Sequence, residues 1–336
     1  MKIDFRYNKF GNFFFFVSNL SEWSFHCRKK YNEEWLRSSH LSKKEKNDLD
    51  KIANFLKRNE GDNIINIFLL AKSKRAAFHD VSLLIDKKDL RIIKDSFDIF
   101  KNRFDKIWKI EKNIFKKAYS EINNKKRSIK LSLDSISKIY NVKNSPIKIT
   151  VVLLLNPLKN RLIGGGSSIG KNAVAIEYSG SNLNKDKDMF QRVLVHEITH
   201  SSFEENTKEE IQKYIKSDKF KNEHGSFLEK SLIYKQVPSL LTILKEMILV
   251  SFVPDGYLAE KFFGKNIIKM LRQRKCIRDS GLQKNYHDLM LYDVFKLYPM
   301  AKKYLDRAKC IDFDYIDLAM NCWVEFETMN TDKWYI

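Results

Sequence analysis

The five residues HEITH at positions 196–200 restrict the fold of this chain more than any other feature of its sequence. Residues four positions apart lie on one face of an α-helix, so both imidazoles can point toward a single metal ion. Glu197 then lies one step around the helix, where its carboxylate can take a proton from a water at the metal. We therefore predict a helix that carries His196 and His200 as Zn²⁺ ligands and Glu197 as a general base.

A zinc site of this kind needs a third protein ligand. The residues after His200 lack the Gly and His of the pattern HExxHxxGxxH, so we expect a carboxylate from a second helix. Glu246 is the only acidic residue of the apolar helix predicted after Pro238, where its burial is costly without a partner such as a metal ion. The alternative is that Glu246 pairs with Lys245 or with an arginine. The rival ligands are Glu223, Glu229 and Glu260, whereas Glu204, Glu205 and Glu209 follow the motif too closely to come from a separate element.

The pattern of apolar residues predicts an α+β fold that is mostly helical, in two parts. Residues 1–144 form a basic, mainly helical region with a short β-hairpin over residues 5–18, where aromatic residues flank Asn-Lys-Phe-Gly-Asn. Residues 145–336 hold a small sheet, the HEITH helix and a helical C-terminal part. The N-terminal helices are expected to begin at a Ser42 cap and to cover 86–122 as one or two helices. Strands are expected at 147–157 and 172–180, and the later helices at 207–217, 226–236, 238–252, 256–273, 286–308 and 311–328.

The glycine-rich stretch GGSSIGKN at 165–172 nearly matches a phosphate-binding P-loop. A P-loop needs a hydroxyl at its last position, which Asn172 lacks, and a helix directly afterward, where this sequence predicts a strand. Nucleotide binding is therefore not expected. The strand Ala173–Tyr178 is either an ordinary sheet strand or one that pairs with an extended substrate.

Composition and charge restrict the class of protein further. A hydrophobic content of 43% is enough for a substantial core, which excludes an intrinsically disordered chain. The formal charge is +20, and residues 1–150 hold 34 of the 62 basic and 18 of the 42 acidic side chains. Because the lysines there are dispersed among acidic residues, we expect a solvated helical surface and no specific nucleic-acid site.

Cysteine spacing and hydropathy favour a cytoplasmic protein. The cysteines form no CxxC pair and are typical of a reducing compartment. They are Cys27, Cys276, Cys310 and Cys322. No apolar run approaches the ~18–20 residues of a membrane span, so no membrane partner is expected.

Two longer segments, VHEITHSSFE and KEMILVSFVPDGYLAEKFFG, carry a resemblance to a known family. Together with the preceding strand, they resemble the gluzincin metallopeptidases, the thermolysin and zinc-aminopeptidase group, and more closely uncharacterised bacterial predicted zinc peptidases. The resemblance covers roughly residues 147–262 and implies a zincin-like catalytic domain. It implies His196, His200 and Glu246 as zinc ligands and Glu197 as the general base. Two features depart from it: Val250 stands where thermolysin-like enzymes commonly have an acidic residue, and the GAMEN-type exopeptidase signature is absent.

Peptide hydrolysis also needs a group that stabilises the negative charge of the tetrahedral intermediate. His287, in KNYHDLML, and Tyr257, in PDGYLAE, are the candidates, and either could instead be structural. His224, in NEHGS, is interpreted as a loop histidine without a catalytic role.

These observations predict a zinc metallopeptidase that hydrolyses a peptide or protein substrate. The nearest alternative is a zinc hydrolase that acts on another amide. An alternative from a different class is a non-proteolytic or regulatory metal-binding protein whose basic N-terminal half binds nucleic acid or an acidic protein.

Overall fold

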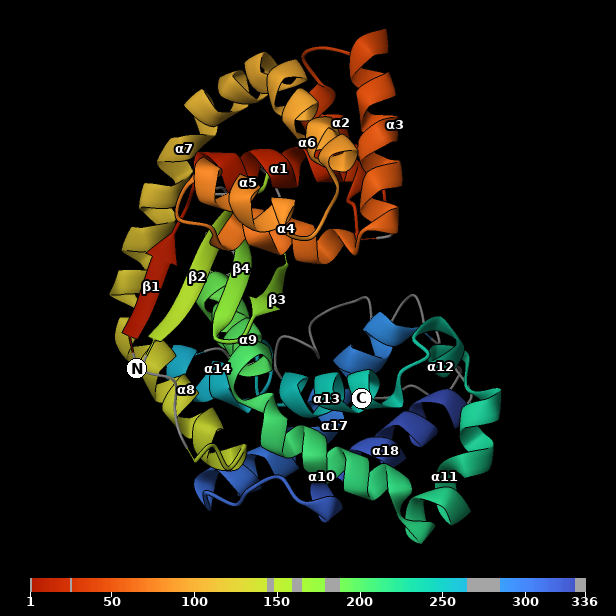
Figure 1. Cartoon of the computed structure of the whole chain (residues 1–336). Helices are drawn as coiled ribbons and strands as arrows, with labels where there is room; N and C mark the ends of the chain where they lie inside the picture. The colour runs from red at the N-terminus through yellow and green to blue at the C-terminus, as the bar shows by residue number, and fades with distance from the viewer. Residues whose placement is uncertain are drawn as a thin grey trace. The chain divides into compact units, whose positions relative to one another are not determined.

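The chain forms two compact units in the computed structural model (Figure 1). The described residues are 2–24, 26–143, 148–158, 165–178, 188–264 and 285–329. The first unit consists of Met1–Asn124 and Lys148–Phe190, and the second of Lys125–Ile147 and Gln191–Ile336. This division differs from the boundary expected at residue 144, because the strands after that residue belong with the N-terminal helices. The protein is α+β and mostly helical, as predicted.

A four-stranded mixed sheet lies in the first unit. Its strands are β1 (Lys2–Arg6), β2 (Lys148–Leu155), β3 (Gly166–Gly170) and β4 (Ala173–Tyr178). They lie in the order β1-β2-β4-β3, as Figure 1 shows, with β1 and β4 parallel to β2 and with β3 antiparallel to β4. Because β1 at the start of the chain pairs with β2 some 145 residues later, the sheet needs both segments.

The inner position of β4 corrects one expectation and confirms another. β4 pairs with β2 on one side and β3 on the other, and all six of its residues are buried. Both edges of β4 are occupied, so the prediction that it could pair with an extended substrate is wrong. The segment after the glycine-rich stretch is a strand, as predicted, and this geometry does not fit a P-loop.

The hairpin predicted over residues 5–18 is wrong. β1 ends at Arg6, and α1 (Lys9–Leu20) follows, with the Asn8 side chain accepting a hydrogen bond from the backbone N–H of Gly11 at its start. Phe13, Phe14 and Phe16 are all buried in α1. A helix that is apolar on nearly every side is stable only in a core, and its apolar run resembles a strand in the sequence.

The helices of the first unit after Ser42 agree with the predicted pattern, whereas α2 (Lys29–Leu36) lies before the predicted start and was not expected. α3 begins at Ser42, whose hydroxyl and Glu45 form a capping box, and the segment predicted over 86–122 forms two helices. These helices are α2 (Lys29–Leu36), α3 (Lys43–Arg58), α4 (Gly61–Leu70), α5 (Lys74–Ser82), α6 (Lys87–Ile99) and α7 (Lys101–Asn124).

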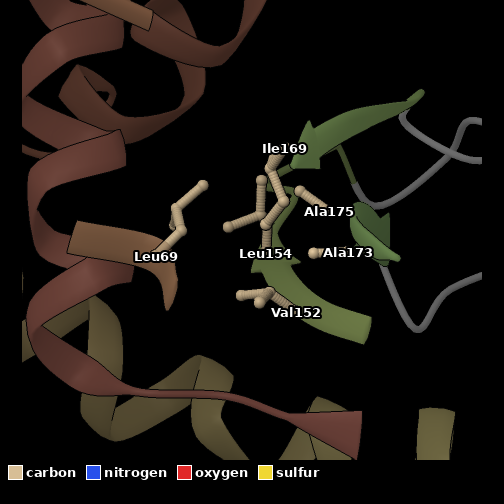
Figure 2. Packing of buried hydrophobic residues seen from close by; sticks show 6 residues of the cluster. All are labelled: Leu69, Val152, Leu154, Ile169, Ala173 and Ala175. Atoms are coloured by element: carbon tan, nitrogen blue, oxygen red, sulfur yellow. The ribbon is translucent and has the colours of Figure 1, made fainter. Parts of the chain in front are cut away.

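One part of the core lies between α4 and a face of the sheet. Figure 2 shows Leu69 of α4 facing side chains from three strands. These side chains are Val152, Leu154, Ile169, Ala173 and Ala175. Alternate residues of β2 and β4 take part, because side chains two positions apart along a strand point to the same face.

All regular secondary structure among the described residues of the second unit is helical. Its helices are α8 (Lys126–Ile139), α9 (Met189–Ser202, which begins in the first unit), α10 (Glu204–Lys216), α11 (Asp218–Lys230), α12 (Leu232–Gln236), α13 (Leu240–Val250), α14 (Tyr257–Phe263), α17 (Tyr286–Asp306) and α18 (Phe313–Thr328). Most predicted helices after residue 207 match these bounds. The single helix expected over 226–236 is wrong, because its residues belong to α11, which begins at Asp218, and to the separate helix α12. The later part of the helix expected over 256–273 lies outside the described residues. The apolar helix α13 is the centre of this unit, in contact with α10, α17 and α18.

Two further expectations can be compared with the described residues. Cys27, Cys310 and Cys322 are free thiols, whereas Cys276 lies outside the described residues. No described helix is both long and apolar enough to span a membrane.

Candidate metal centre

The two histidines of α9 face each other, as the HEITH spacing predicts. Their ring centroids are 4.6 Å apart with an interplanar angle of 79°, and the Nε2 atoms of His196 and His200 are 3.0 Å apart. The two side chains expose only 11% and 15% of their area. Two imidazole nitrogens that converge in a nearly buried position could hold a metal ion as two of its ligands.

Glu246 of α13 completes a group of three ligand atoms. Its Oε1 lies 2.9 Å from His200 Nε2, and its Oε2 lies 3.5 Å from His196 Nε2. The three donor atoms are all within 4.8 Å of one another. Burial would raise the pKa of Glu246, but hydrogen bonds from both histidines hold this pKa well below its usual range. The site therefore presents an ionised carboxylate beside two imidazoles.

The rival carboxylates lie elsewhere in the second unit. Glu260 accepts a hydrogen bond from the hydroxyl of Tyr298, and Glu229 is exposed. Glu223 lies beside His224 and not in the group with Glu246. Of the four carboxylates considered from the sequence, the structure brings only Glu246 to the two histidines.

Glu204 orients the ring of His200 through a hydrogen bond at Nδ1, the nitrogen that faces away from Glu246. Its Oε1 is 2.5 Å from Nδ1 of His200, and its other oxygen pairs with Lys245. A ring that donates a hydrogen bond from Nδ1 keeps the lone pair of Nε2 free for a metal ion. Lys245, which the sequence offered as an alternative partner of Glu246, thus supports the site through Glu204. The sequence reasoning set Glu204 aside because it follows the motif so closely, yet four residues after His200 is the spacing that places it on that ring.

A backbone carbonyl orients the first histidine. Nδ1 of His196 lies 3.0 Å from the carbonyl oxygen of Val253, in the loop between α13 and α14. The fully buried Arg192, one turn before His196, holds the same loop by donating from Nε to the carbonyl of Pro254 at 2.6 Å. Its guanidinium also pairs with Asp255 at 3.4 Å. The loop from Ser251 to Gly256 therefore fixes the orientation of the His196 ring.

Electrostatics set the protonation of the remaining groups. Burial acts to lower the pKa of His200, but Glu204 and Glu246 raise it to about 10 in the metal-free protein, so that metal binding must release a proton. Glu197 is 9% exposed, and burial raises the pKa of its carboxyl group against the opposing effect of the two imidazoles. A raised pKa suits a carboxylate that must accept a proton near neutral pH.

Of the two residues expected to stabilise the negative charge, Tyr257 is hydrogen-bonded elsewhere and His287 is exposed. The hydroxyl of Tyr257 donates to Asp306 of α17 at 3.2 Å, and burial and Asp306 raise the pKa of this phenol. His287 is exposed on the first turn of α17. The structure brings neither of them into the group formed by His196, His200 and Glu246.

Two tyrosines that the sequence reasoning missed are within electrostatic range of Glu246. Burial, and then the negative charge of Glu246, raise the pKa of Tyr286, the residue directly before His287. Tyr140, at the end of α8, is fully buried, and Glu204 and Glu246 add to the rise of its pKa. The raised pKa values keep both phenols protonated at neutral pH. The helix α17 packs on α13, and α8 packs on α14 and α17, an arrangement that no local spacing in the sequence indicates.

Comparison with known proteins assigns the chain to no family. No family model matches the chain, and neither the curated proteins nor the solved structures include a significant match. The donor set itself fits a zinc ion, because two imidazole nitrogens and one carboxylate are a common set of protein ligands at catalytic zinc. Both imidazoles also have the second hydrogen bond that ligand histidines in metal sites usually make.

Proposed function

We propose that the protein is a zinc-dependent metallopeptidase, with His196, His200 and Glu246 as ligands and a zincin-like catalytic region around α9 and α13. The observation that carries this proposal is the convergence of these three side chains from two helices. The bracing of both imidazoles at Nδ1 supports it further, because it fixes the tautomer that leaves each Nε2 lone pair available. The resemblance to gluzincins agrees with this order of ligands along the chain.

The chemistry divides between the ion and the protein. Bound zinc would supply a Lewis acid that polarises the substrate carbonyl and lowers the pKa of water. Glu197, next in sequence to the ligand His196, accepts the proton of the attacking water and passes it to the leaving amine. Tyr286 takes the charge-stabilising role that we expected of His287 or Tyr257, because its phenol stays protonated within electrostatic range of Glu246 and could donate a hydrogen bond to an oxyanion.

The substitution Glu197→Gln tests this proposal. Glutamine has the size of glutamate but cannot take the proton, so the variant should retain zinc and lose about 10²–10⁴-fold in hydrolysis rate. Cleavage of a mixture of unstructured peptides by the zinc-loaded full chain would be followed by mass spectrometry, beside zinc content. Glu205→Gln, at an exposed position of α10, is the matched control and should behave as the wild type. Full hydrolysis by Glu197→Gln, or no cleavage by the zinc-loaded wild type, would contradict the proposal.

A further inference from the structure

A buried histidine outside the candidate metal centre has no hydrogen-bond partner for one of its nitrogens. His224 lies on α11 and not in the loop expected from the sequence, and it is only 4% exposed. Its Nε2 is buried and lacks a hydrogen-bond partner among the described residues. A buried polar atom without a partner is costly, and a bound metal ion would satisfy this nitrogen.

Two carboxylates face this nitrogen at a distance too long for direct bonding. Nε2 of His224 is 3.8 Å from Oδ1 of Asp317 on α18 and 3.9 Å from Oε2 of Glu223. Hydrogen bonds of this type are shorter than about 3.2 Å. Ligand atoms that each lie about 2.1 Å from one tetrahedral ion are, in contrast, about 3.4 Å from one another. All three donor atoms lie within 4.8 Å of one another, so small adjustments would let them share one ion.

Asp317 is held in place by its other neighbours. The hydroxyl of Tyr214 donates to its Oδ1 at 2.9 Å, while Lys219 and Asn321 bind Oδ2 at 2.8 Å and 3.2 Å. Burial would raise the pKa of Asp317, but its hydrogen bonds with Lys219 and Tyr214 keep this pKa below the usual value. The carboxylate is therefore ionised and oriented by a second hydrogen bond, as ligand carboxylates in metal sites are.

We propose that Glu223, His224 and Asp317 form a second divalent metal site, distinct from the site on α9 and α13. One imidazole and two carboxylates suit a first-row transition ion such as Zn²⁺ or Co²⁺, with water completing the coordination. The ion would join α11 to α18, since two ligands come from the first helix and one from the second. The site uses no residue assigned to hydrolysis, so it does not depend on the proposed function.

Binding of Co²⁺ to the full chain, measured by equilibrium dialysis after removal of bound metal, tests this second site. The wild type should bind two ions, and both His224→Gln and His196→Ala/His200→Ala should bind one. Glu223→Gln should weaken the binding of one ion at least tenfold, and because the Glu223 side chain is 50% exposed this variant should fold even if His224→Gln does not. Glu229→Gln, at another exposed position of α11, is the matched control and should leave binding unchanged.

The same titration separates the two proposals. A single ion in the wild type that is lost in His196→Ala/His200→Ala, with no effect of Glu223→Gln or His224→Gln, would overturn the second site and leave the proposed function intact. A single ion that survives in His196→Ala/His200→Ala but is lost in Glu223→Gln would support the second site and count against the proposed function. If the wild type binds two ions and neither Glu223→Gln nor His224→Gln changes the number or the affinity of the bound ions, the second site would also be overturned.

Discussion

His196 and His200 have different second partners, although they occupy equivalent positions in the motif. A backbone carbonyl accepts from the first ring, whereas a carboxylate, Glu204, accepts from the second. A carboxylate partner increases the basicity of a ligand imidazole more than a neutral carbonyl does. His200 therefore depends on a single side chain, which substitution can remove.

Glu204→Gln should weaken zinc binding about 10–100-fold, because the amide cannot supply the negative charge that now faces Nδ1 of His200. Competition with a chromogenic chelator measures the zinc affinity. Glu205→Gln, one residue further along α10, is the control and should bind zinc with the wild-type affinity. Equal affinities in the two variants would show that Glu204 does not support the ligand.

Site residues that are marked by their spacing along one helix could be predicted from the sequence. Site residues that come together only through tertiary packing could not. The i and i+4 histidines and the isolated acidic residue of an apolar helix were recognisable without a structure. Tyr286 and Tyr140 were not, because their electrostatic interaction with Glu246 depends on the packing of α17 and α8, which are far apart in the sequence.

At the scale of elements, the loop from Ser251 to Gly256 links the fold to the site. It carries the carbonyl of Val253, and its ends are joined by a hydrogen bond from the N–H of Tyr257 to the carbonyl of Ser251. A Cβ at Gly256 would lie 2.0 Å from that carbonyl oxygen. Glycine is therefore required where the chain turns back on itself.

Gly256→Ala should destabilise the protein by about 2–4 kcal/mol, since the added methyl group collides with backbone that cannot move aside easily. It should also reduce zinc retention, because the displaced loop carries the partner of His196. Gly225→Ala, in the middle of α11, is the control: its Cβ would meet no atom within 4 Å, and it should stabilise the protein by about 0.5–1 kcal/mol. Chemical denaturation of both variants measures these changes, and equal stabilities would refute the role given to the loop.

Most elements were predictable because their apolar residues recur with helical spacing or form β-branched runs. The errors have separate causes. α1 is surrounded by core, so its aromatic run lost the periodicity that marks a helix, and the short strand β3 has too many glycines and serines to resemble a strand. Pairing between β1 and β2 also lies beyond any local pattern.

At the scale of the whole molecule, the charge of +20 is the dominant property. In the first unit, several basic side chains pair with acidic neighbours. Examples are Arg103 with Glu45, Arg58 with Asp89, and Lys9 and Lys101 with Asp105. These ion pairs offset part of the basic excess locally, and the solvated surface without a specific nucleic-acid site stays a prediction.

Nucleic acids should therefore bind weakly and without sequence preference. The affinity should fall steeply between 50 and 200 mM salt, by about 10³-fold or more if six or more phosphates are contacted, because binding of this kind is driven by counterion release. Fluorescence anisotropy with two unrelated labelled duplexes and one single strand measures it. Tight, sequence-selective binding that persists at about 150 mM salt would contradict the solvated surface. It would favour a regulatory protein that binds nucleic acid.

The most direct test of the central claim is a crystal structure of the zinc-soaked full chain with anomalous data at the zinc edge. We expect an anomalous peak about 2.0–2.2 Å from Nε2 of His196, Nε2 of His200 and a carboxylate oxygen of Glu246. Glu197 should lie beside the ion without being one of its ligands. A peak held by the two histidines with Glu223, Glu229 or Glu260 would contradict the ligand assignment. The absence of any peak between His196 and His200 would contradict the metal centre itself.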